Sequence, residues 1–343
     1  MLYATFAIRA PSSLAKIGPG FDVTGLALSL YLELRLHRPL EDVVRPPAQF
    51  QSQLRGRWRR QPAPRPPGKP HRPRRLLCPP PPRPARLPVE THVHVINPIP
   101  LGRGLRSSGA AVVAGVMLGG EAGGLHHLAD ERLFDFCFMI ERHPDNIGAT
   151  LFGGVVGTYL KPLSPEDVAR VEIPLSGVIP DPQPAGTEDT GKQPPEPPVE
   201  IGHHIRFPWA KDIKAVAIVP EFEVPIAPPR GVLPETYPRQ DIIFKLQRIA
   251  LLPVAFGQSP PDPDLIYLAM QDKLHQQYRM GLVPGLTGGL LGVCLFGSGP
   301  TILALAMDSF EEIAERIIGL FRKQDITCKW LPLEPAEGTK VIR

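Results

Sequence analysis

The sequence predicts an α+β protein with more than one domain, on three observations. The chain has 343 residues, which is long enough for two domains that each bury a core. Residues 28–37 and 91–100 alternate apolar and polar side chains with the period of a strand. Residues 292–306 contain two apolar runs joined by Gly-Ser-Gly-Pro, which predicts two strands and a turn. Because helical patterns stand between and after these strands, we expect an α+β sandwich.

Composition places the chain among soluble intracellular proteins. We find no continuous apolar run of about 18 residues, and the first residues lack the basic start and apolar core of a secretory signal. The cysteines at positions 78, 137, 294 and 328 are widely spaced, so we expect free thiols rather than disulfides or a metal site. These features predict a cytoplasmic protein that does not act at a membrane.

Positive charge is concentrated in one segment of the chain. The net charge is +4, but residues 43–89 contain eleven Arg, one Lys and no Asp or Glu, which leaves the remainder at about −8. Residues 45–89 are also dense in proline, which removes backbone hydrogen-bond donors. We therefore expect disorder or polyproline II conformation over 45–89.

A glycine-rich, cationic loop precedes an apolar run within residues 98–120. The run over 107–118 predicts a buried helix with Ser107 or Ser108 as its N-cap. A helix N-terminus presents unpaired N–H groups and a partial positive charge, and glycines let a phosphate approach the backbone closely. The spacing is neither a Walker A motif nor a full dinucleotide fingerprint, so the pattern alone leaves a phosphate site and an ordinary turn both open. The candidate anion-binding residues are Gly102, Gly104, Ser107, Ser108 and Gly109.

Two further helices are expected after this loop. One spans about 130–142 and ends because Pro144 disfavours helical geometry in the residue before it. Pro144 can itself open the next helix, with Asp145 close to the positive end of that helix. The expected apolar face of the first consists of Leu133, Phe136, Cys137 and Ile140.

The second half follows a proline-rich, acidic stretch at 180–198 that is typical of a linker or long surface loop. A strand is predicted at 214–220 and a helix at 241–252. Ser309 and Glu312 have the spacing of a capping box at the start of a last helix. The apolar stripe expected on that helix consists of Phe310, Ile313, Ile317 and Leu320.

Four ordered motifs resemble the GHMP small-molecule kinases and, within them, the fungal homoserine kinases. They are RAPSSLAKIGPGFDVTGLALSL at 9–30, the glycine-rich loop with its helix, ERHPDNIGATLFGG at 141–154 and GVCLFGSGPTILALA at 292–306. The resemblance covers most of 1–37 and 90–343, and four motifs in order are far more specific than any one of them.

The resemblance implies a two-domain GHMP kinase fold. We expect an N-terminal ATP-binding domain over 1–179 that is similar to the second domain of ribosomal protein S5, with 38–89 as an aberrant segment. A proline-rich linker or loop at 180–204 would lead to a ferredoxin-like C-terminal sandwich over 205–343. The resemblance also implies a homodimer.

The same resemblance implies a kinase that transfers phosphate from ATP to L-homoserine, in threonine biosynthesis. Ser108 and Glu141 are then expected to hold Mg²⁺, which prefers hard oxygen ligands. Asp145 would lie at the substrate hydroxyl, and the residues leave open whether it removes the proton or only orients the group. The ATP loop would comprise Pro100, Leu101, Gly102, Arg103, Gly104, Leu105, Arg106, Ser107 and Ser108. The homoserine pocket would comprise Lys16, Asp22, Asp145, Asn146, Arg230 and Arg279.

Three residues depart from the family pattern inside these motifs. Lys16 stands where an asparagine is usual, and its ammonium would oppose the ammonium of homoserine. Arg106 replaces a glycine, which predicts a stiffer loop that cannot take a positive φ. Phe296 replaces a serine in the late glycine turn, where a ring could intrude on the loop. The segment 38–89 and a shortened stretch near 283–293 also differ from the family.

Two alternatives remain from the sequence. The departures fit a ligand-sensing relative that binds ATP without transferring phosphate. The Arg/Pro-rich block instead suggests an interaction protein that tethers nucleic acid or binds proline-recognition domains. The block contains only Phe50 and Trp58 for stacking on bases, so we do not expect nucleic acid as a partner.

Overall fold

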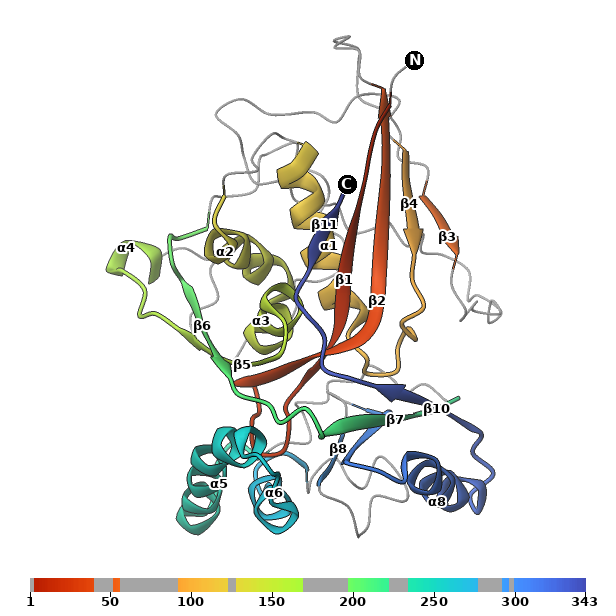
Figure 1. The fold of residues 1–343 in the computed structure, drawn as a ribbon. Coiled ribbons are helices and arrows are strands. Elements are labelled where there is room, and N and C mark those ends of the chain that lie inside the picture. The colour runs from red at the N-terminus through yellow and green to blue at the C-terminus, as the bar shows by residue number, and fades with distance from the viewer. Residues whose placement is uncertain are drawn as a thin grey trace, which may run out of the picture.

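The computed structural model describes residues 3–39, 52–55, 92–122, 128–168, 197–221, 234–276, 292–295 and 299–343. These ranges form two sheets with helices packed beside them (Figure 1). None of the helices in these ranges is long and apolar enough to span a membrane.

The larger sheet has seven strands within the described ranges, and its centre is a long antiparallel pair, β1 and β2. Strand β2 alternates as the sequence predicts, with Leu32, Leu34 and Leu36 buried and Arg35 and His37 exposed. The strands are β1 (Tyr3–Ala15), β2 (Thr24–Pro39), β3 (Ser52–Arg55), β4 (His92–Ile96), β5 (Val155–Leu160), β6 (Gly202–Phe207) and β11 (Lys340–Ile342).

The expected disorder of the Arg/Pro-rich segment is wrong for its four described residues. Ser52–Arg55 forms β3, which pairs in parallel with β4. This short run lies in a stretch without proline, so its backbone N–H groups are available for a sheet. The rest of 45–89 lies outside the described residues.

The smaller sheet is antiparallel, with the order β10-β7-β9-β8 within the described ranges. The predicted pair of strands around the Gly-Ser-Gly-Pro turn is confirmed, because β8 and β9 pair from Gly292 with Leu305 to Leu295 with Ile302. The strands are β7 (Lys214–Pro220), β8 (Gly292–Leu295), β9 (Ile302–Ala306) and β10 (Cys328–Leu333).

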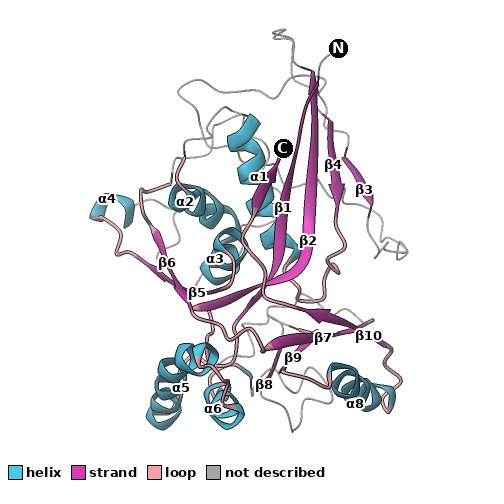
Figure 2. Cartoon of the chain, viewed as in Figure 1, coloured by secondary structure: helices cyan, strands magenta, loops and turns pink. Residues whose placement is uncertain are grey.

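Helices cover the two sheets separately, as Figure 2 shows. Helices α1 and α3 pack against β1 and β2, α2 packs against both helices, and α8 packs against β7 and β10. The helices are α1 (Ser107–Ala122), α2 (Asp130–Glu141), α3 (Pro144–Phe152), α4 (Pro165–Val168), α5 (Arg239–Gly257), α6 (Pro263–Ala269) and α8 (Phe310–Arg322).

Two predicted helix limits are corrected by packing. Helix α1 continues past Leu118 to Ala122, because the surrounding core buries it on most sides. Helix α5 was expected to end before Pro253 but continues to Gly257. Burial of the last turn, including Phe256, offsets the hydrogen bond that the proline cannot donate.

The capping box predicted for α8 is wrong. Ser309 has a left-handed backbone (φ 55°), and its side chain makes no capping hydrogen bond within the described structure. The box requires an extended N-cap residue whose hydroxyl points back along the helix, so this conformation prevents it. The predicted apolar stripe is confirmed in part, because Ile317 is buried and Phe310 and Ile313 pack partly buried against the same core. The buried face also includes Ala314, Ile318 and Phe321.

The C-terminal strand returns to the first sheet. Strand β11 pairs antiparallel with β1, matching Ile8 with Val341, and therefore lies beside the N-terminal strand (Figure 1). Just before β11, the N–H of Ala336 donates a 2.9 Å hydrogen bond to the carbonyl of Ala27 on β2. The last segment of the chain thus joins the sheet that carries the glycine-rich motifs.

Candidate functional site

The glycine-rich loop connects β4 to α1, and its backbone takes left-handed conformations at three residues. The φ angles are 70° at Gly102, 89° at Gly104 and 55° at Arg106. The expectation that Arg106 could not take a positive φ is therefore wrong, although this conformation costs a residue with a Cβ about 1–2 kcal/mol. The loop keeps the glycine-like path despite the arginine.

Asn97 and Ser107 close the base of this loop. The side-chain amide of Asn97 donates a 2.8 Å hydrogen bond to the hydroxyl of Ser107. Because α1 begins at Ser107, the N-cap position belongs to Arg106, so the prediction of a serine N-cap is wrong. Ser108 lies in the first turn of α1, where the backbone N–H groups have no partner within the helix.

The smaller sheet braces the loop from the other side. The guanidinium of Arg103 donates to the carbonyl of Pro220 at the end of β7. The N–H of Thr301, beside β9, donates to the carbonyl of Arg103 at 3.3 Å. The Arg103 side chain is thereby directed to β7, and the loop is connected to both sheets.

Ser108 and Glu141 come together from the start of α1 and the end of α2. The Ser108 hydroxyl donates to Glu141 Oε1 at 3.4 Å, and the Glu141 carboxylate is almost fully buried. His143 Nδ1 lies 3.4 Å from the same oxygen and 3.0 Å from the carbonyl of Glu141. No group of three or more His, Cys, Asp or Glu with metal-binding geometry occurs in the described ranges.

Helix α3 places Asp145 and Asn146 at its buried first turn. Asp145 is 0% exposed, and its Oδ1 accepts a 2.9 Å hydrogen bond from the N–H of Asn146. Asp145 Oδ2 and both polar side-chain atoms of Asn146 have no hydrogen-bond partner in the described part of the chain. Buried polar atoms are rarely left in this state, so these atoms mark a place where a ligand can bind.

The pKa of Asp145 is raised from 3.8 to about 6, chiefly by burial and also by the charge of Asp22. Lys16, His143 and Arg106 act on this pKa in the opposite direction. We call the buried region around Asp22 and Asp145 the acidic pocket. Because Arg106 acts on Asp145, this region lies within electrostatic range of the glycine-rich loop. Two carboxyl groups and several cations are therefore gathered in one poorly solvated region.

Lys16 and Asp22 belong to the connection between β1 and β2. The Lys16 ammonium lies 3.3 Å from Asp22 Oδ1 and 4.1 Å from the centre of the Phe21 ring. Both residues have a positive φ, 73° and 56°. The connection is fastened to the segment after α6, because His275 Nε2 lies 2.9 Å from the carbonyl of Gly18. The predicted pocket residues Lys16, Asp22, Asp145 and Asn146 are thus brought together.

Comparison with known proteins shows which family has this arrangement. Residues 83–154 match the family model described as the GHMP kinases N terminal domain. The chain is 47% identical to homoserine kinase from Saccharomyces cerevisiae over 98% of each chain. The chain belongs to the homoserine kinase family. It is also 42% identical to homoserine kinase from Candida albicans, over 96% of this chain and 95% of that protein.

The fold of this homoserine kinase family member is similar to that of a solved structure. The crystal structure of homoserine kinase from Cytophaga hutchinsonii superposes with a TM-score of 0.65 at 21% identity, covering 98% of this chain and 97% of that chain. The GHMP kinase fold expected from the sequence motifs is confirmed.

Sequence reasoning missed two buried serines on β1 of this family member, and one of them, Ser13, lies beside the candidate site. Ser12 and Ser13 are fully buried on β1, and neither hydroxyl has a hydrogen-bond partner among the described residues. An added Cβ on Gly109 would lie 3.6 Å from Asn146 Cβ and 4.0 Å from Ser13 Oγ, so this serine faces the starts of α1 and α3. The available signal was two consecutive serines in the strand, at the bulge between Pro11 and Ser12.

Three predicted residues cannot be placed in the site of this homoserine kinase family member. Arg230 and Arg279, the expected carboxylate clamp, lie outside the described residues, as does Phe296. Their expected roles stay predictions.

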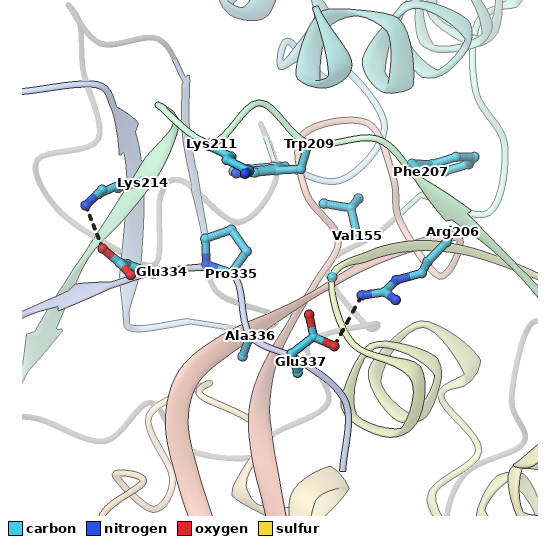
Figure 3. A pocket seen from close by; sticks show the side chains of 11 residues that line it. Val155, Arg206, Phe207, Trp209, Lys211, Lys214, Glu334, Pro335, Ala336 and Glu337 are labelled. Atoms are coloured by element: carbon cyan, nitrogen blue, oxygen red, sulfur yellow. Dashed lines mark hydrogen bonds and ion pairs between the residues drawn. The ribbon is translucent and has the colours of Figure 1, made fainter. Parts of the chain in front are cut away.

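A separate pocket of about 500 Å³ lies between the two sheets, and Figure 3 shows the side chains that line it. None of the residues predicted for the site of this homoserine kinase family member lines the pocket. Four of its five charged side chains are paired, Lys214 with Glu334 at 2.6 Å and Arg206 with Glu337 at 3.9 Å. None of its lining side chains has an unpartnered buried polar atom among those described. We therefore do not assign the reaction to this pocket.

Proposed function

We propose that this protein transfers the γ-phosphoryl group of ATP to the hydroxyl of L-homoserine and forms O-phospho-L-homoserine for threonine biosynthesis. The observation that supports this proposal is that the glycine-rich loop and the start of α1 lie beside the acidic pocket. The Ser108 hydroxyl, at the start of α1, lies 3.4 Å from the Glu141 carboxylate. His143 lies 3.4 Å from the same carboxylate and acts electrostatically on the buried Asp145. Similarity to fungal homoserine kinases over nearly the whole chain supports the choice of substrate.

The glycine-rich loop is proposed to bind the triphosphate. Its positive φ angles at Gly102 and Gly104 and the free N–H groups at the start of α1 suit an anion. Bracing through Arg103 fixes the loop against β7 before the nucleotide binds. A preorganised loop stabilises the developing charge without reorganisation, and phosphoryl transfer depends mainly on such positioning.

Ser108 and Glu141 are proposed to hold Mg²⁺. A hydroxyl and a carboxylate 3.4 Å apart are two hard oxygen donors, which fits a metal that completes its coordination with water and phosphate oxygens. When bound, Mg²⁺ neutralises charge on the outer phosphates. His143 Nδ1 lies 3.4 Å from the same Oε1 atom that the Ser108 hydroxyl contacts, so both side chains hold this carboxylate in place.

Asp145 and Asn146 are proposed to position the hydroxyl of homoserine. The unpartnered Asp145 Oδ2 can accept the hydroxyl hydrogen, and the amide of Asn146 can bind the hydroxyl oxygen. The oxygen then forms a bond to the γ-phosphorus while the bond to the β-phosphate oxygen breaks, and ADP leaves. Asp145 is mostly ionised above pH 6, so it can receive the hydroxyl proton late in the transfer.

Asp22, Arg230 and Arg279 are proposed to bind the ends of the amino acid. Asp22 offers a carboxylate for the ammonium, next to Asp145. The two arginines would bind the carboxylate through planar guanidinium forks. Lys16 belongs to the same pocket through its contact with Asp22.

The test is ATP consumption with L-homoserine against a panel of mevalonate, galactose and serine, with the phosphorylated product identified by mass spectrometry. We expect turnover that depends on homoserine and exceeds that of every other alcohol. Turnover that prefers another alcohol would overturn the choice of substrate. Binding of ATP without transfer to any alcohol would instead favour the ligand-sensing alternative.

A homodimer is proposed from family resemblance alone. Sedimentation velocity at two protein concentrations separates a dimer from a monomer, and a monomer at both would refute this proposal.

A further inference from the structure

The acidic pocket already contains a cation supplied by the chain. The Lys16 side chain is 3% exposed, and its ammonium is 3.3 Å from Asp22 Oδ1. The Phe21 ring lies 4.1 Å from the same ammonium, which adds a cation–π contact. A lysine this deeply buried is unusual unless its charge is paired, and Asp22 is the pairing carboxylate.

The backbone directs this ammonium inward. Lys16 has φ 73°, and its N–H donates to the carbonyl of Thr24 at 3.0 Å, where β1 and β2 separate. Gly18, on the same connection, accepts from the side-chain amide of Gln276 at 3.2 Å. The main chain on both sides of the lysine is therefore fixed, so its side chain cannot leave the pocket by a simple loop movement.

The same ammonium lies in electrostatic range of the proposed transfer site. Its charge acts on Asp145, as the charge of Asp22 does with the opposite sign. A tethered ammonium on Asp22 thus takes the place that the proposed function gives to the ammonium of homoserine.

We infer that Lys16 determines substrate selectivity: by occupying Asp22 it lowers the preference for homoserine over a hydroxy acid that lacks the amine. This inference rests on the proposed function. A bound homoserine must displace the Lys16 ammonium from Asp22 or place its own charge beside it, and both cost free energy in a poorly solvated pocket. A substrate such as 4-hydroxybutanoate has the same hydroxyl and carboxylate and meets no such competition.

The experiment compares kcat/KM for L-homoserine and for 4-hydroxybutanoate at saturating ATP. The variants are Lys16→Met, which keeps the length of the side chain without its charge, and Lys16→Asn, which suits a left-handed backbone. Lys161→Met is the matched control, because Lys161 pairs with Glu200 at 3.4 Å on an exposed surface. Binding of each compound is also measured by calorimetry in the presence of a non-hydrolysable ATP analogue.

We expect both Lys16 variants to raise the ratio of kcat/KM for homoserine to kcat/KM for 4-hydroxybutanoate by tenfold or more. A lower dissociation constant for homoserine should account for this rise. The control should keep the wild-type ratio. If homoserine is phosphorylated and the ratio is the same in wild type and in whichever Lys16 variant folds, the inference is overturned while the proposed function stands. If neither wild type nor any variant phosphorylates or binds homoserine, the proposed function fails, and the inference fails with it.

Discussion

Substitution of Asp145 by asparagine should stabilise the protein at neutral pH while removing most of its activity. Asp145 is fully buried, and its pKa is raised from 3.8 to about 6, chiefly by burial. The folded state therefore binds a proton at Asp145 more tightly than the unfolded state does. Above pH 6 the ionised carboxyl lowers the free energy of unfolding, and this cost disappears as the pH falls toward 3.8.

The magnitude follows from the size of the shift. About two pKa units correspond to roughly 3 kcal/mol at 1.36 kcal/mol per unit. Asp145→Asn keeps an oxygen that can accept from the N–H of Asn146, so the main loss is the charge. We expect the variant to exceed wild type in free energy of unfolding by about 2–3 kcal/mol at pH 8. We expect little difference near pH 4.

Urea unfolding at several pH values between 4 and 8 measures this difference, with Asp212→Asn on the exposed turn before β7 as the control. Phosphoryl transfer by Asp145→Asn should fall by about 10²–10⁴-fold, the usual contribution of a positioned acid–base group. A variant that is less stable than wild type at pH 8, or a stability difference that does not change with pH, would refute the reasoning from burial.

Other changes test the metal pair, the close packing around α3 and the bracing of the loop. Glu141→Gln should lower kcat by about 10²-fold and raise the Mg²⁺ concentration needed for half-maximal rate, as steady-state titration would show. Gly25→Ala should destabilise the protein by more than about 2 kcal/mol, because its Cβ would overlap the carbonyl oxygen of Asp145. Gly319→Ala meets open space within α8 and should stabilise the protein by about 0.5–1 kcal/mol. Thermal melts measure both changes. Arg103→Ala removes a charged hydrogen bond to β7 and should raise the KM for ATP about tenfold with little change in the KM for homoserine; an unchanged KM for ATP would contradict the bracing role.

The parts of the fold that the sequence predicts well are those decided by neighbouring residues. The alternation of β2 and the breaker at Pro144 fix their elements locally, and both are found as predicted. The return of β11 to β1 and the pairing of β5 with β2 are not visible in the sequence, because these pairings join segments that are far apart in the chain. The left-handed backbone at Ser309 also depends on its surroundings, so the local capping pattern was misleading.

The candidate site was predictable where a motif names a residue type and unpredictable where packing gives the residue its role. Ser108, Glu141 and Asp145 stand in motifs, and the structure brings Ser108 to Glu141. Ser13 resembles any serine in a strand until α1 and α3 are packed against it. The use of Arg103 as a brace likewise depends on β7, which lies far away in the sequence.

The unpartnered polar atoms around the starts of α1 and α3 connect stability with binding. Asp145 Oδ2, the Asn146 amide and the hydroxyl of Ser13 are buried without hydrogen-bond partners among the described residues. Each such group costs about 1–3 kcal/mol in the free protein. A fold can keep several of them together only if the rest of its core compensates, and they lower the free energy of the complex once a polar ligand meets them. A polar ligand that forms hydrogen bonds with these atoms would therefore remove a cost that an apolar ligand of equal size would leave in place.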